Sequence, residues 1–129
     1  MKKKNIILGV DPGLKNTGWG VIESFNNKEK YVSHGVIETK PSNLLGDRLC
    51  LIFNNLINLM QEFNPNHVAV EKIFSNTNPD STLKLGKARG IIFLVAARNN
   101  IKISEYSPNT VKKNLVGYGH ASKLQIIEM

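Results

Sequence analysis

The chain has 129 residues, which fits one domain and leaves little room for two, and 41% of them are apolar, too many for a disordered chain. No run of eighteen apolar residues is present, so we expect no membrane-spanning segment, and the single cysteine, Cys50, excludes an internal disulfide framework and a cysteine zinc site. The 17 basic and 10 acidic residues give a formal charge of +7, which favours a polyanionic partner and makes nucleic acid the leading class.

The first half of the chain predicts three strands followed by a helix. The apolar run 6–11 is typical of a central strand that is buried on both faces. Residues 18–24 and 31–38 also have strand patterns, and their short connections indicate an antiparallel meander. Within 45–63 the apolar residues recur every three or four positions, which predicts an amphipathic helix with Ser42 as its N-cap.

The second half of the chain alternates strands with helices. Its expected elements are a strand over 67–71, a helix from about 79 to 98, a strand over 101–106, a short helix from Ser107 and a last segment capped by Ser122. Helical crossovers of this length connect parallel strands. The order β-β-β-α-β-α-β-α therefore predicts an α/β fold with one mixed five-stranded sheet and helices on both faces.

Two carboxylates stand at the ends of expected strands: Asp11 closes the first strand and Glu71 the fourth. If these strands are parallel neighbours, both side chains leave the sheet at one edge, where ligands of open α/β sheets gather. Close carboxylates favour a cation between them, and Mg²⁺ prefers oxygen ligands. A pair of such ions could hold the attacking water and the leaving oxygen of a phosphodiester. Asp before Pro-Gly is also common turn chemistry, so Asp11 alone does not decide between the two interpretations.

Five short motifs then follow one another along the chain. They are Asp11-Pro12-Gly13 with Thr17-Gly18-Trp19-Gly20, Val70-Glu71-Lys72-Ile73-Phe74, Leu83 to Gly90, Val111-Lys112-Lys113, and Gly117-Tyr118-Gly119 with Lys123. With these motifs the sequence resembles the RuvC-type Holliday junction resolvases of bacteria. The resemblance implies a ribonuclease H-like fold and a homodimer that binds a four-way DNA junction. It also implies symmetric nicking of two opposed strands with Mg²⁺ or Mn²⁺ in recombination and repair, and branch-migration motor proteins as partners.

The resemblance also implies roles for individual residues. Asp11 and Glu71 match the first two metal-binding carboxylates of the family, and Phe74 matches an aromatic residue that stacks on an unpaired base. Lys112 and Lys123 match basic residues that contact DNA near the cut. Stacking on an exposed aromatic ring contributes roughly 1–3 kcal/mol per base. The competing interpretations are that Phe74 is a core residue and that the two lysines are solvated surface charges.

Gly86 and Gly90 lie four residues apart on the expected second helix, with small and apolar residues around them. Small residues at this spacing let another helix approach closely. The resemblance makes this helix the dimer contact, and a two-fold symmetric interface is the usual arrangement in homodimers. Packing within one subunit is the alternative.

The sequence departs from the family pattern at its C-terminal end. In the family a final helix carries two more acidic ligands, and residues 1–129 supply no match for them. We therefore expect a single ribonuclease H-like domain that is C-terminally truncated relative to the family, with weak or absent cleavage and an exposed apolar patch near Ile126 and Ile127.

Two other functions stay open. One is a non-catalytic junction-binding module of the same fold. The other is an ATP-binding domain of the actin and sugar-kinase class, which needs a second Asp-x-Gly loop that the chain lacks. A bacterial cytoplasmic location is the simplest account, because the apolar run after the N-terminal lysines is too short for a signal peptide.

Overall fold

The computed structural model describes residues 4–72 and 78–106. Along the chain the elements are β1 (Asn5–Asp11), β2 (Asn16–Phe25), β3 (Lys28–Glu38), α1 (Leu45–Phe63), β4 (His67–Glu71), α2 (Pro79–Arg98) and β5 (Lys102–Tyr106). This order confirms the expected succession of elements as far as the fifth strand. The helix expected from Ser107 and the segment capped by Ser122 lie outside the described residues.

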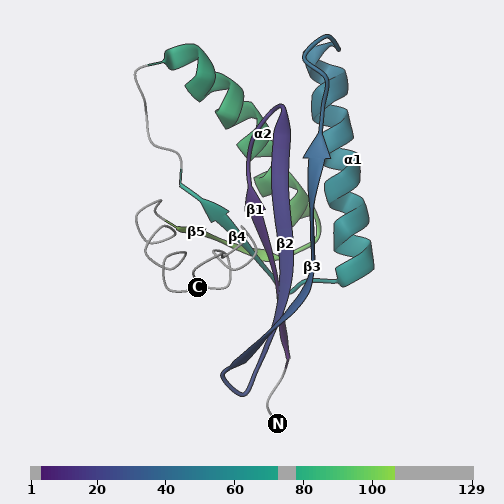
Figure 1. Ribbon diagram of the computed structural model, residues 1–129, viewed down its shortest axis with the longest axis vertical. Helices are drawn as coiled ribbons and strands as arrows, with labels where there is room; N and C mark the ends of the chain where they lie inside the picture. The colour runs from purple at the N-terminus through teal and green to yellow at the C-terminus, as the bar shows by residue number, and fades with distance from the viewer. Residues whose placement is uncertain (1–3, 73–77, 107–129) are drawn as a thin grey trace.

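The five strands form one mixed sheet in the order β3-β2-β1-β4-β5 (Figure 1). β1 pairs with β2, and β2 with β3, in antiparallel register, whereas β4 runs parallel to both β1 and β5. The β2–β3 turn lies at one end of the molecule, and both helices begin at the opposite end. That second end is therefore the edge at which β1, β3, β4 and β5 all finish. The expected mixed sheet is confirmed, and the two described helices, α1 and α2, pack on the same face of it.

One apolar core fills the space between the sheet and both described helices. Its strand residues share one face of the sheet, and its helix residues form the buried stripes of α1 and α2. The fully buried members include Leu8, Val21, Ile52, Leu56, Val68, Ile92 and Val95. Burying a side chain of this size contributes roughly 1.5–3 kcal/mol, so this face of the sheet determines which side the helices cover. Within the described residues, no helix combines the length and the apolar character that a membrane crossing requires.

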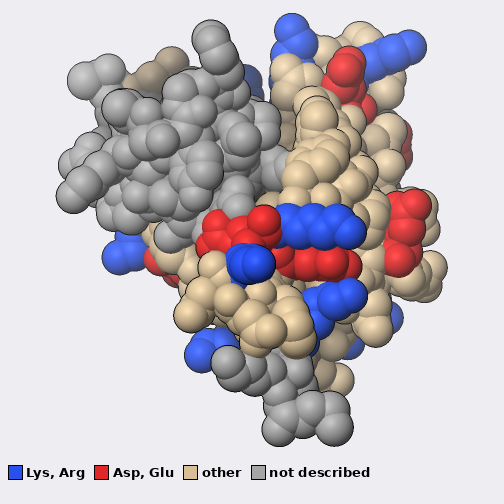
Figure 2. All heavy atoms as spheres, turned by 60° about the horizontal axis from the view of Figure 1, so that its bottom comes forward, with Lys and Arg blue, Asp and Glu red and all other residues tan. Residues whose placement is uncertain are grey.

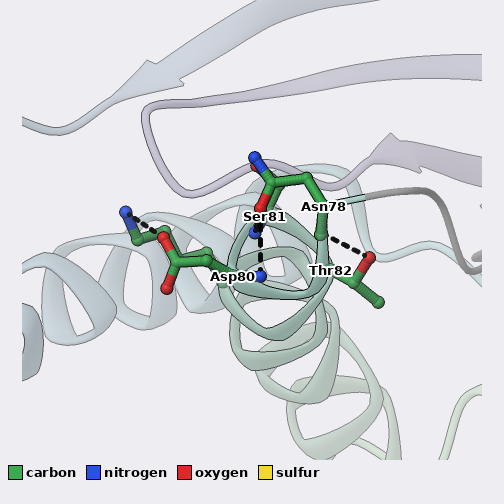
Figure 3. Close-up of polar contacts among 5 residues, drawn as sticks. Asn78, Asp80, Ser81 and Thr82 are labelled. Carbon is green, nitrogen blue, oxygen red and sulfur yellow. Dashed lines mark hydrogen bonds and ion pairs between the residues drawn. The ribbon is translucent and has the colours of Figure 1, made fainter.

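The helix ends differ from one another in how they are capped. Ser42 is not the N-cap of α1, because a turn in which Asn43 N–H binds the Lys40 carbonyl at 3.0 Å delays the helix to Leu45. For α2 the cap is Asn78, whose side-chain oxygen accepts bonds from the backbone N–H groups of Asp80 and Ser81 at 3.1 and 3.2 Å (Figure 3). This is the usual chemistry of an N-cap, and it fixes where α2 begins.

The loop after Asp11 is held by two buried threonines. Thr17 donates its hydroxyl to the Gly13 carbonyl at 2.6 Å, and Thr39 donates its hydroxyl to the Leu14 carbonyl at 2.6 Å. Arg48 Nε in turn donates to the Thr39 hydroxyl at 2.9 Å. Both threonines are buried, so water cannot replace these bonds cheaply. The network therefore defines the conformation of the loop that follows Asp11.

We predict that Thr39→Val lowers the free energy of unfolding by about 1–3 kcal/mol, because it leaves the Leu14 carbonyl and Arg48 Nε without this buried partner. Urea denaturation measures the loss. Ser42→Ala is the matched control, since Ser42 is exposed in the next turn and its hydroxyl does not cap α1. A denaturation midpoint unchanged by Thr39→Val would contradict the assigned role.

Candidate functional site

The parallel pairing of β1 with β4 brings two carboxylates to one edge of the sheet. The last paired positions are Val10 and Val70, and both strands end one residue later, at Asp11 and Glu71. Neighbouring strands lie roughly 4.8 Å apart, and residues in register point to the same face. Val10 and Val70 belong to the core under the helices, so Asp11 and Glu71 point to the other face, and both are half-buried. The structure thus brings together the two residues that the sequence paired.

The sheet beside Asp11 carries very small side chains. Gly18 lies opposite Asp11 on β2, and Gly9 pairs with Gly20 on one side and with Ala69 on the other. These four positions present nothing larger than a methyl group. All four positions are buried, and their small size is what lets other groups lie close to this face of the sheet beside Asp11.

Within the described part of the chain, Asp11 and Glu71 are the two carboxylates that end neighbouring parallel strands at this edge. Among residues 4–72 and 78–106, no group of three or more His, Cys, Asp or Glu side chains could hold a metal ion. Mg²⁺ keeps several water ligands and is commonly bound through one or two carboxylates together with substrate phosphates. Asp11 and Glu71 therefore fit a hard divalent cation whose remaining ligands are water and phosphate oxygens.

Three exposed lysines lie at the same edge, and the sequence analysis did not single them out. Lys15 follows β1 in the loop to β2, Lys40 follows the end of β3, and Lys72 follows Glu71. The Thr39 N–H binds the Lys15 carbonyl at 2.9 Å, which holds the first two connections together. None of the three lysines makes an ion pair with another described residue. Positive charge is therefore available beside the carboxylates.

The opposite end of the molecule has a different character. Figure 2 brings that end forward and shows acidic and basic side chains beside one another. Lys4 and Glu23, which lie at this end, form an ion pair at 3.6 Å. His67 also lies there, at the start of β4, where burial and then the nearby Lys102 lower its pKa below the usual value. Part of the positive charge at this end is therefore paired with a carboxylate.

α2 presents an apolar stripe away from the core. Leu83 is 65% exposed and Leu94 49% exposed, and Gly86 and Gly90 lie between them at helical spacing. A Cβ atom added at either glycine would meet nothing within 4 Å. The two glycines are therefore not needed for packing against the described part of the same chain.

The remaining residues singled out from the sequence cannot be placed. Phe74, Lys112 and Lys123 lie outside the described residues, as do Ile126 and Ile127. Sequence reasoning missed the buried threonine network, although Thr17 was part of a quoted motif. Its signal was weak, because the hydrogen bond from Thr39 to Leu14 joins residues 25 positions apart.

Comparison with known proteins identifies the family. The profile of the family described as crossover junction endodeoxyribonuclease RuvC matches residues 7–129. The chain is 44% identical over 120 residues to the crossover junction endodeoxyribonuclease RuvC of Paramagnetospirillum magneticum and to that of Sinorhizobium medicae. Each alignment covers 93% of this chain and 72% of the relative.

Solved structures agree with the sequence comparison. Thermus thermophilus RuvC in complex with a Holliday junction substrate superposes with a TM-score of 0.80 and 28% identity, over 95% of this chain and 74% of that one. The yeast mitochondrial Holliday junction resolvase Ydc2 superposes with a TM-score of 0.64 over 95% of this chain and 59% of that one; at 18% identity it supports the fold alone. From the profile, the close relatives and the shared ribonuclease H-like architecture, this chain belongs to the RuvC family of crossover junction endodeoxyribonucleases.

Proposed function

We propose that the chain binds four-way DNA junctions and hydrolyses phosphodiester bonds in them with the help of a divalent cation. The observation that carries the proposal is the register of β1 and β4, which puts Asp11 and Glu71 side by side at the carboxyl edge of the sheet. Membership of the RuvC family supports it, as does the Holliday junction substrate bound to the Thermus thermophilus relative.

In this mechanism Asp11 and Glu71 would hold the cation, Mg²⁺ or Mn²⁺. Such an ion would supply Lewis-acid activation of the phosphodiester and of the attacking water. The two carboxylates supply the negative charge that attracts the ion, and they orient it from a fixed sheet edge.

A second candidate function, junction binding without cleavage, is favoured by one observation. The described residues contribute only two carboxylates and no third acidic, histidine or cysteine ligand. Phosphate contacts to lysine require no metal, so binding would survive where cleavage is weak. The two functions differ only in turnover, and one assay separates them.

We predict that a Mg²⁺- or Mn²⁺-dependent nick appears in a synthetic four-way junction and not in a linear duplex of the same sequence. Asp11→Asn and Glu71→Gln should each reduce the nicking rate about 100-fold or more, equivalent to roughly 2.7 kcal/mol of transition-state stabilisation. Both should bind the junction without divalent ions as well as the wild type does.

Glu38→Gln is the matched control for these two substitutions. Glu38 ends β3 at the same edge of the sheet but is exposed and lies two strands away from Asp11. Its loss should leave nicking close to the wild-type rate. Nicking that persists in both Asp11→Asn and Glu71→Gln would refute the metal mechanism. Tight binding of the junction by a wild type that never nicks would select the binding-module function instead.

We also propose that Lys15, Lys40 and Lys72 contact junction phosphates. Each phosphate contact releases counterions, so Lys40→Gln should weaken binding and lower the slope of log affinity against log salt by about one unit. Lys28→Gln at the β2–β3 turn is the control, because it removes the same charge from the opposite end of the molecule. Equal effects of the two substitutions would show that net charge alone drives binding.

The exposed stripe on α2, defined by Leu83, Gly86, Gly90 and Leu94, is proposed as the contact between two copies of the chain. Exposed leucines at helical spacing form an apolar patch that a second copy would cover. The glycines between them leave space for the partner's helix. Two-fold symmetry would make the stripe pack on its own counterpart and present two equivalent sites to a symmetric junction.

Gly90→Leu should shift the chain from dimer to monomer in sedimentation velocity runs at low concentration. A Cβ at this exposed position meets nothing within 4 Å in the described part of its own chain, so we expect the monomer to stay folded. Gly46→Leu on α1 is the matched control, since a Cβ there also meets nothing within 4 Å and Gly46 is exposed. Dissociation by Gly46→Leu, or none by Gly90→Leu, would disprove the proposed interface.

A further inference from the structure

We infer that Arg89 is a positioning residue for Glu71, which it orients by binding the Glu71 main chain rather than its carboxylate. This inference rests on the proposed function, because it assigns a task to a residue that serves the proposed metal ligand. Arg89 lies on α2, on the side that faces β4 and β5, and its side chain is only 14% exposed.

Three contacts hold the Arg89 guanidinium in place. Its Nε donates a hydrogen bond to the Glu71 carbonyl at 3.3 Å, and its Nη2 binds Glu105 Oε2 on β5 at 2.5 Å. Its Cζ lies 4.8 Å from the centre of the Phe93 ring, one helical turn further along α2. The group is therefore fixed by a charge pair on one side and by an aromatic face on the other, with one N–H directed at the strand end.

The neighbouring strand β1 cannot supply a backbone N–H that donates a hydrogen bond to the Glu71 carbonyl. Lys72 N–H binds the Tyr106 carbonyl at 2.6 Å, so the neighbouring polar groups of β4 face β5. Main-chain groups alternate in direction along a strand, so the N–H and C=O of Glu71 face β1. The register that joins Val10 to Val70 makes Pro12 the next donor in this parallel ladder, and proline has no N–H. Arg89 supplies a donor at the position where the ladder cannot.

This bond affects the direction of the Glu71 side chain. β4 ends at Glu71. Without a partner for the Glu71 carbonyl, the peptide plane after this residue would be free to rotate. A charge-assisted hydrogen bond is stronger than a neutral one, and it fixes the peptide plane on the C-terminal side of the Glu71 Cα. The Lys72 bond to Tyr106 fixes the following N–H. With both groups of this peptide held, the Glu71 Cα–Cβ bond keeps one direction, on the face of the sheet that also carries the Asp11 side chain.

Lysine could not replace arginine fully at this position. The planar fork of a guanidinium can bind the Glu71 carbonyl and the Glu105 carboxylate at the same time and stack on Phe93. An ammonium is a compact point charge and would keep the ion pair at the expense of the carbonyl bond or of the stacking. Arg89→Lys should therefore retain the charge and lose part of the orientation.

The test uses the whole chain labelled with ¹³C and compares the wild type with Arg89→Gln. Mn²⁺ broadens the carboxyl resonances of residues that bind it, and the concentration that half-broadens the Glu71 signal should rise about 10-fold in Arg89→Gln, as for other supporting residues of metal sites. Arg89→Lys and Glu105→Gln should give smaller shifts in the same direction. Junction binding without divalent ions should stay at the wild-type level.

Arg98→Gln is the matched control. Arg98 lies on the same helix, carries the same charge and stacks on Phe53 at 5.8 Å, but it ends α2 far from Glu71. Arg98→Gln should leave unchanged the Mn²⁺ concentration that half-broadens the Glu71 signal. An equal shift in Arg98→Gln, or none in Arg89→Gln, would overturn the inference. If Arg89→Gln does not fold, Arg89→Lys and Glu105→Gln decide it by the same criterion.

A metal-free measurement separates this inference from the proposed function. Three-bond couplings in the chelated protein should report one dominant χ1 rotamer for Glu71 in the wild type and averaging in Arg89→Gln. A wild type that nicks no junction and shows no Mn²⁺ broadening would refute the proposed function and leave this result standing. Averaged couplings in the wild type itself would overturn the positioning role.

Discussion

The parallel pairing of β1 with β4 is the constraint on which the site depends. Asp11 and Glu71 are separated by sixty positions in the chain, and only a helical crossover returns β4 alongside β1 in the same direction. α1 is that crossover, and its apolar stripe packs on the face opposite the carboxylates. Packing of α1 in the core therefore makes β4 run parallel to β1. Because the two strands are parallel, both end at the same edge of the sheet, where Asp11 and Glu71 meet.

Each of the two carboxylates lies at the end of a strand, and side chains from other elements hold the backbone there. The threonine network holds the loop after Asp11, and Arg89 with Glu105 holds the strand end at Glu71. Main-chain groups at strand ends have lost their ladder partners, and unmade bonds there are costly when the groups are buried. Thr17 on β2, Thr39 just after β3 and Arg89 on α2 supply bonds at these points. Arg48 of α1 and Glu105 of β5 in turn bind two of these side chains. The elements that pack the core thus also define the geometry of the edge.

The sequence predicted the elements well because their signals are local. Hydrophobic periodicity placed α1 at 45–63 and β4 at 67–71, and the crossover lengths predicted the parallel pairing. Ser42 failed as a cap because residue type alone does not distinguish an N-cap from the turn before it. Lys15, Lys40 and Lys72 were missed for a different reason. Lys15 and Lys40 are far from Glu71 in the chain and share its edge only after the strands have taken their directions. Lys72 stands beside Glu71 in a quoted motif, but its residue type alone did not assign it a role.

α2 takes part both in the proposed dimer contact and in the orientation of Glu71, because adjacent residues of this helix serve the two roles. Arg89 points into the gap between helix and sheet, toward Glu71, while Gly90 faces outward on the apolar stripe. A helix is stiff along its axis, and its Asn78 cap and its buried residues, such as Ile92, hold it against the sheet. A second copy that packs on the stripe would contact α2, the same rigid helix that carries the Arg89 guanidinium. Assembly of two copies and orientation of Glu71 would then depend on one element, and loosening of α2 would impair both.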